Sequence, residues 1–197
     1  NTLATSLDQA VTGSIDDALK LGCAAIGFTI YPGSDHNFSL MEEYRELSHE
    51  AKAKGLAVVL WAYARGTNIS KKGETAMNII SYAAHMSALL GANIIKVKLP
   101  SDFLEEDPTK AAFENNKIAI GSLQERVAHI KKVAFEGKRL LVFSGGDAKD
   151  DNALMEETKA IHFGGGNGSI IGRNCFQRAR QDSLALLDQM IQIYKSK

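Results

Sequence analysis

The sequence predicts an α/β fold, a (β/α)8 TIM barrel of which residues 1–197 supply strands four to eight with their helices. Apolar strands begin near residues 23, 56, 92, 139 and 169, and helical patterns separate them. Such unbroken alternation is typical of a parallel sheet covered by helices. The short glycine-rich strands and the lack of a hairpin signal favour a closed barrel over an open sheet.

Five strands are too few to close such a barrel, which usually takes about 250 residues. The alternative, an open five-stranded sheet, leaves two sheet edges unpaired. We therefore expect residues 1–197 to be the C-terminal part of one barrel domain. Strands one to three would precede Asn1 in the native protein or lie on another chain.

Composition excludes several classes of partner. The chain is 45% hydrophobic and 23% charged, with a formal net charge of zero. The sequence has no basic run, so nucleic acid is not an expected partner. No apolar run approaches the roughly 20 residues that span a bilayer, so no membrane association is expected. Two distant cysteines, Cys23 and Cys175, fit a reducing cytoplasm.

The elements of the first half are bounded by local start and stop signals. We expect helices over 14–22, 39–55 and 77–91, and strands over 23–30 and 56–62. Each helix ends at a glycine, the residue that most easily adopts the left-handed conformation after a helix. Ser39 and Glu42 show the pattern of a capping box, in which each side chain satisfies a backbone N–H of the first turn.

The second half continues the alternation after a long polar loop. We expect strands over 93–98, 139–143 and 169–171. Helices are expected over 122–137, from the turn at 144–147 to about 162, and from 172 onward. Ser122 and Glu125 form a second capping box. The last helix should carry Leu184, Leu187 and Ile191 on one face. The loop over 100–121 is unusually long, and loops of that length are often functional.

Two lysines, Lys96 and Lys98, lie two residues apart in an apolar strand and therefore point to the same side. A lysine in an apolar pocket beside a second cation has a lowered pKa, and a neutral amine can form a Schiff base with a carbonyl. The alternative is an edge strand with two solvated lysines. On this segment alone, the alternative is the better interpretation.

The preceding strand ends in Trp61, Tyr63 and Arg65, which share one face. Facing inward, they would supply a flat apolar wall, a phenol that can donate and accept a proton, and a cation. Ordinary aromatic packing with a surface arginine explains the same pattern at least as well.

Glycine-bearing turns follow the last two strands. They are Ser144, Gly145 and Gly146 after one strand, and Gly172 and Arg173 after the next. Glycines at this position let backbone N–H groups approach an anion, and the last two strands of a barrel often share a phosphate site. The alternative is that the glycines serve tight turns only. The five histidines show no metal-ligand spacing, so no metal site is expected.

Taken together, these segments resemble the archaeal-type class I fructose-1,6-bisphosphate aldolases, which also occur in bacteria. The matching segments are Thr29–Ser34, Val59–Gly66, Gly91–Lys98, Phe143–Gly146 and Ile171–Asn174, in order across nearly the whole chain. They look like strand ends four to eight of that family's barrel. The family also has an aspartate at the end of strand one, which lies outside this sequence.

The resemblance implies a role for each residue singled out above. Lys96 would be the Schiff-base lysine, Tyr63 the proton donor, and Lys98 a cationic neighbour that contacts substrate. Trp61 and Arg65 would line the substrate, and the two glycine turns would hold a phosphate. It further implies reversible cleavage of fructose 1,6-bisphosphate, a cytoplasmic homo-oligomer, and no cofactor or metal, because the iminium polarises the substrate.

Two other functions remain open at this stage. One is a related Schiff-base enzyme, such as a transaldolase or thiolase-like relative, acting on another phosphosugar. The other is a barrel that binds a phosphosugar without catalysis. A further possibility is that residues 1–197 alone are inactive or unfolded, because their barrel is incomplete.

Overall fold

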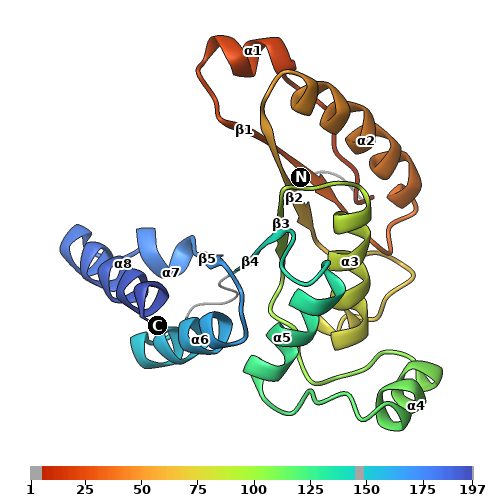
Figure 1. Cartoon of the computed structure of the whole chain (residues 1–197), viewed down its shortest axis with the longest axis vertical. Helices are drawn as coiled ribbons and strands as arrows, with labels where there is room; N and C mark the ends of the chain where they lie inside the picture. Colours follow the sequence, from red (N-terminus) through yellow and green to blue (C-terminus); the bar gives the residue numbers. More distant parts are fainter. Residues whose placement is uncertain (1–5, 145–148, 197) are drawn as a thin grey trace.

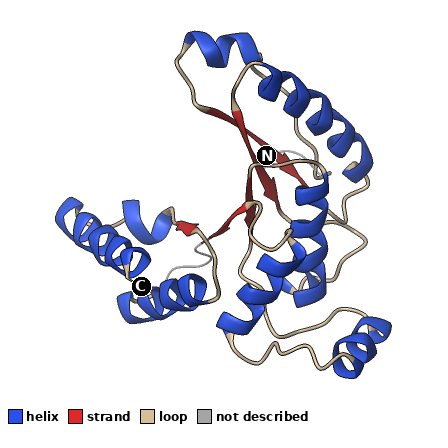
Figure 2. Ribbon diagram, in the orientation of Figure 1, coloured by secondary structure: helices blue, strands red, loops and turns tan. Residues whose placement is uncertain are grey.

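Five parallel strands form one sheet in the order β1-β2-β3-β4-β5 (Figures 1 and 2). The computed structural model describes residues 6–144 and 149–196. The strands are β1 (Ala25–Ile30), β2 (Ala57–Ala62), β3 (Ile94–Val97), β4 (Leu140–Ser144) and β5 (Gly168–Ile170). All four neighbouring pairs are parallel. The prediction of an α/β fold with five strands in this sequence order is confirmed.

Helices lie between successive strands, before β1 and after β5. They are α1 (Ile15–Lys20), α2 (Asn37–Ala53), α3 (Met77–Leu89), α4 (Asp107–Asn115), α5 (Leu123–Val133), α6 (Asp151–Phe163), α7 (Arg173–Phe176) and α8 (Arg180–Lys195). A short 3-10 helix, η1 (Gly73–Thr75), precedes α3. The parallel strands require such crossovers, because a tight turn can join only antiparallel strands.

The two faces of the sheet differ in burial. Along β2, Val58 and Leu60 are fully buried, whereas the alternate residues Val59 and Trp61 are partly exposed. The buried set belongs to the main core, which α2, α3 and α5 complete on the same face. The opposite face carries Thr29, Trp61, Lys96 and Ser144, and Trp61 and Ser144 are partly exposed, so the described residues cover one face of the sheet more fully than the other.

Asparagines satisfy backbone groups where two strands begin. The Val58 N–H donates to Asn93 Oδ1 over 2.9 Å, and the Leu141 N–H donates to Asn167 Oδ1 over 2.9 Å. Each asparagine precedes the neighbouring strand and takes the place of a missing ladder partner. Pairing is thereby extended beyond the regular strands, because an unpaired buried N–H would cost about 1–3 kcal/mol.

The predicted capping boxes have different outcomes. The Ser122 and Glu125 box is present at the start of α5. The box at Ser39 is wrong, because α2 begins at Asn37 and its N-cap is His36. The helix begins earlier in the chain than predicted. Ser39 therefore lies inside its first turn, and Ser39 Oγ donates to the His36 carbonyl over 3.0 Å.

The loop predicted over 100–121 contains a helix, α4, in which no residue is buried. Pro108 lies in its first turn, where the fixed φ of proline favours helix formation and its missing N–H costs nothing. α4 has nine residues, fewer than the roughly 11–18-residue window over which the apolar period of a helix is recognised in a sequence.

The predicted C-terminal helix is two helices, α7 and α8, with a break over 177–179. The break changes which residues face the core. Leu186 and Met190 are buried beside Leu154 of α6, whereas Leu184 and Ile191 are half exposed. The face that α8 buries is thus not the one that carries Leu184 and Ile191.

We predict that Gly27→Ala displaces the indole of Trp61. A Cβ at Gly27 would lie 1.8 Å from Trp61 Cζ3, so the ring must leave its place over β1. Trp61 is the one tryptophan of the chain, and greater exposure should move its fluorescence emission to longer wavelength. Gly13→Ala is the matched control, because a Cβ at Gly13 would meet nothing within 4 Å. Identical emission from both variants would contradict the packing of Trp61 on Gly27.

Candidate functional site

A cavity of about 590 Å³ lies at the C-terminal ends of β2, β3 and β4. The residues that line it are Tyr63, Arg65, Lys71, Glu74, Thr75, Lys98, Leu99, Leu123, Ser144, Lys149, Glu157 and Arg173. Five of the residues predicted from sequence are therefore brought together. Ligands of parallel α/β proteins bind at this edge of the sheet.

Lys96 lies in β3 next to this cavity. It pairs with Trp61 of β2 and with Val142 of β4 in the strand register. Its side chain is buried, with 9% of the residue exposed, and Nζ lies 5.6 Å from the centroid of the Tyr63 ring. The structure thus places an amine and a phenol side by side on the face of the sheet that carries Trp61.

The two glycine turns are only partly described. Gly145 and Gly146 lie outside the described residues, so their part in a phosphate site stays a prediction. Ser144 ends β4 opposite Ile170 of β5 and lines the cavity. Gly172 is the N-cap of the four-residue helix α7. Arg173, the first residue of that helix, reaches the cavity wall.

Glu74 is a site residue that the sequence analysis missed. It lies on η1, and its carboxylate accepts a hydrogen bond from Lys98 Nζ at 2.6 Å and pairs with Lys71 Nζ at 3.0 Å. Arg65 Nε lies 3.7 Å from the same carboxylate. Glu74 stands in a polar stretch between two elements, where no local pattern distinguishes it from a solvated glutamate.

The pKa values of Glu74 and Lys98 both lie below their ordinary values, for different reasons. Burial raises the pKa of the Glu74 carboxyl, but the hydrogen bonds from Lys98 and Lys71 outweigh it, so the pKa lies below the ordinary value of 4.5. Burial lowers the pKa of the Lys98 ammonium, and the bond to Glu74 compensates only in part, because Arg65 and Lys71 repel it. Glu74 is thus stabilised as an anion, whereas the charge on Lys98 remains costly.

A second ion pair joins Lys149 to Glu157 at the cavity wall. The backbone N–H of Lys149 donates to Asn174 Oδ1 over 2.9 Å, which links the start of α6 to α7. With this pair included, five basic and two acidic side chains line the cavity. The excess of positive charge favours an anionic ligand.

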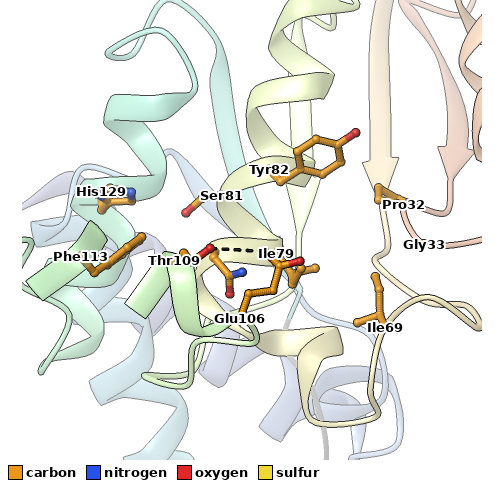
Figure 3. A pocket seen from close by; sticks show the side chains of 11 residues that line it. Pro32, Gly33, Ile69, Ile79, Ser81, Tyr82, Glu106, Thr109, Phe113 and His129 are labelled. Carbon is orange, nitrogen blue, oxygen red and sulfur yellow. Dashed lines mark hydrogen bonds between the residues drawn. The ribbon is translucent and has the colours of Figure 1, made fainter. Parts of the chain in front are cut away.

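Another cavity, of about 510 Å³, lies beside α3, α4 and α5 (Figure 3). Its walls include Ile69, Tyr82 and Phe113, with Glu106 and His129 as titratable groups. Burial lowers the pKa of His129, which favours the neutral ring. This cavity has no lysine or arginine among its described lining residues, so it is poorly suited to a phosphorylated ligand.

Two further observations concern the described residues only. Within 6–144 and 149–196, no group of three or more His, Cys, Asp or Glu side chains is arranged to hold a metal ion. Across the same ranges, no helix has the length and apolar character needed to cross a bilayer.

Comparison with known proteins places the chain in a family. The pattern described as DeoC/LacD family aldolase matches residues 2–178. The chain therefore belongs to the DeoC/LacD family of aldolases. Its curated relatives include a fructose-bisphosphate aldolase class 1 of Halobacterium salinarum, 32% identical over 171 residues that cover 87% of this chain and 56% of that protein. Another is the fructose-bisphosphate aldolase/6-deoxy-5-ketofructose 1-phosphate synthase of Methanocaldococcus jannaschii, 29% identical over 153 residues that cover 78% of this chain and 43% of that protein.

Solved structures agree with this assignment. An archaeal fructose 1,6-bisphosphate aldolase superposes with a TM-score of 0.81 at 27% identity, over 99% of this chain and 68% of that one. A second archaeal aldolase structure, with its catalytic lysine covalently bound to the carbinolamine intermediate, gives a TM-score of 0.80 at 26% identity, over 99% of this chain and 67% of that one. The chain spans a little over half the length of the Halobacterium relative.

We predict that Glu74→Gln lowers the free energy of unfolding at pH 7 by about 1–3 kcal/mol, because Lys98 then stays buried without its counter-charge. A carboxyl whose folded pKa is depressed stabilises above its unfolded pKa, near 4.5, and the effect is lost as the pH falls through the folded value. Urea unfolding between pH 7 and 3 measures the difference.

The control for this measurement is Glu156→Gln, which removes an exposed partner of Lys159 on α6. It should change stability by less than about 0.5 kcal/mol. An equal loss of stability in both variants, or a Glu74→Gln deficit that persists unchanged at pH 3, would show that the Lys98 pair is not the cause.

Proposed function

We propose that the protein containing this chain is a class I, Schiff-base fructose-bisphosphate aldolase. It cleaves fructose 1,6-bisphosphate reversibly to dihydroxyacetone phosphate and glyceraldehyde 3-phosphate. The observation that carries the proposal is the buried amine of Lys96 beside the Tyr63 ring, next to a cavity with excess positive charge. Family membership supports the reaction class, and the relatives' names support the substrate.

In this mechanism, unprotonated Lys96 Nζ attacks the C2 carbonyl of the ketose and forms a carbinolamine. Loss of water then gives an iminium. When the C4 hydroxyl loses its proton, the C3–C4 bond breaks, its electron pair moves into the iminium, and the aldehyde leaves. Protonation of the resulting enamine at C3 and hydrolysis release the second product and restore the amine.

Tyr63 is positioned to move protons in these steps, because its ring lies against the end of the Lys96 side chain. A phenol can donate a proton to the leaving water and accept one from a hydroxyl. Trp61 provides an apolar wall beside Lys96 in the adjoining strand. The cation side chains Arg65, Lys98 and Arg173 bind phosphate, since they line the cavity above the amine.

The same proposal covers the parts of the protein that the chain does not include. A segment or chain supplying strands one to three would complete the (β/α)8 barrel and bring the additional carboxylate. Gly145, Gly146 and Gly172 would join Ser144 and Arg173 in a phosphate site. The protein would act in the cytoplasm as a homo-oligomer.

A second candidate is an aldolase that acts on another phosphorylated ketose. The Methanocaldococcus relative favours this candidate, because its name gives two activities. One is fructose-bisphosphate aldolase, and the other is the synthesis of 6-deoxy-5-ketofructose 1-phosphate. Both candidates share the Lys96 imine and differ in the substrate that reaches it. Comparing kcat/KM for fructose 1,6-bisphosphate with that for other phosphoketoses separates them.

Borohydride trapping tests the proposed lysine. Reduction of the full natural protein with dihydroxyacetone phosphate should add the mass of one reduced adduct, because borohydride reduces an iminium to a stable secondary amine. Lys96→Met should abolish the adduct. Lys20→Met, at the exposed end of α1, should retain it. An adduct in Lys96→Met would refute the assignment, and an unlabelled wild-type protein would refute the Schiff-base mechanism.

We predict that Tyr63→Phe lowers kcat by about 10²–10⁴-fold, the usual contribution of a positioned proton-transfer group. The Lys96 amine remains, so prolonged borohydride treatment should still label this variant. Steady-state kinetics with an aldehyde-coupled assay gives kcat. A kcat within about twofold of wild type would exclude Tyr63 as the proton-transfer group.

A further inference from the structure

The Glu74 carboxylate forms ion pairs with three cationic side chains from three segments of the chain. Lys98 follows β3, Arg65 follows β2, and Lys71 precedes η1. The Glu74 and Lys98 side chains are mostly buried, with 14% and 16% exposure, whereas Lys71 is 87% exposed. Exposed ion pairs contribute little, so the partner that matters is Lys98.

We propose that Glu74 is a positioning residue for the aldolase reaction, holding the Lys98 ammonium charged and directed into the cavity beside Lys96. This inference rests on the proposed function, since Lys98 matters there as a cation that meets the phosphosugar. Glu74 itself acts through Lys98 and not on the reacting carbon atoms.

The structure holds Glu74 in place through its backbone. The Glu74 N–H donates to the Ser70 carbonyl over 3.2 Å. Ser70 in turn donates through both N and Oγ to the Glu105 carboxylate, each over 2.8 Å. The Ser101 N–H donates to the Thr75 carbonyl over 2.7 Å. The segment that carries the carboxylate is therefore tied to the chain that follows β3 on both sides of Glu74.

Lys98 needs such a partner because its surroundings disfavour a charge. Burial lowers its pKa, and Arg65 and Lys71 lower it further, whereas the Glu74 carboxylate raises it. The other titratable groups that line the cavity are Tyr63, Lys149, Glu157 and Arg173, and the Glu157 charge already has Lys149 as its partner. Without Glu74, the ammonium would lose its proton at lower pH or turn toward solvent.

The arrangement also explains how one lysine of the pair can be a nucleophile while the other stays a cation. Lys96 lies within β3 and Lys98 directly follows it, and the 2.6 Å bond to a carboxylate is made by Lys98. An incoming phosphate can then share the ammonium with Glu74, because the cluster holds three cations for one carboxylate.

The test is the pH profile of kcat/KM for fructose 1,6-bisphosphate in wild type, Glu74→Gln and Glu74→Asp. Glu74→Gln should lower kcat/KM by about 10-fold or more, as expected for a weakened charge-assisted contact, and should move the alkaline limb to lower pH. Glu74→Asp, which keeps the charge, should move the limb less. Glu156→Gln is the control and should match wild type.

A double variant separates positioning from folding. In a Lys98→Met background, Glu74→Gln should cause no additional shift of the alkaline limb, because its effect passes through Lys98. A Glu74→Gln variant that loses activity by the same factor at every pH, with an unmoved limb, has a structural role only and overturns the proposal.

A second readout is independent of aldolase activity. The NMR signal of ¹³Cε-labelled Lys98, assigned with Lys98→Arg, should titrate at lower pH in Glu74→Gln than in wild type. An unchanged midpoint overturns the proposal. The titration midpoint could shift although the natural protein shows no aldolase activity. That result would refute the proposed function and the role of Glu74 in catalysis, but it would support the electrostatic effect of Glu74 on Lys98.

Discussion

The parallel register of β2, β3 and β4 is the constraint on which the rest of the site depends. It sets Trp61, Lys96 and Val142 in one row across the sheet. Because side chains alternate along a strand, a slip of one residue would turn Lys96 toward the helices, among buried side chains of the neighbouring strands such as Leu60 and Leu141. That face packs into the apolar core, so the cost of burying an ammonium there favours the observed register.

One face of the sheet contributes mainly to stability, and the other carries the side chains proposed for the chemistry. The helix-covered face is apolar and supplies most of the core. The other face carries an amine, a phenol and an indole, and its cations are balanced from outside the sheet by Glu74 on η1. The Glu74–Lys98 ion pair thus lies at the strand ends and not in the apolar core, at the cost of a desolvated Lys98.

Strands and their strand-end residues could be predicted because their signals are local. Apolar runs, helix-ending glycines and the spacing of Lys96 from Lys98 all lie within a few residues of one another. Glu74 could not be predicted, because its partner Lys98 is 24 residues away and meets it only after β3 has formed. The same holds for α4, whose helix buries no residue, and for the break before α8, where packing on α6 decides which apolar residues face inward.

A crystal structure of the full natural protein soaked with dihydroxyacetone phosphate tests the central claim most directly. The account predicts continuous electron density from Lys96 Nζ to C2 of the ligand, the Tyr63 hydroxyl within hydrogen-bond distance of the reacting atoms, and the Lys98 ammonium still bound to Glu74. Density joined to Lys98 instead, or a ligand bound in the cavity of Figure 3 with Lys96 unmodified, would contradict it.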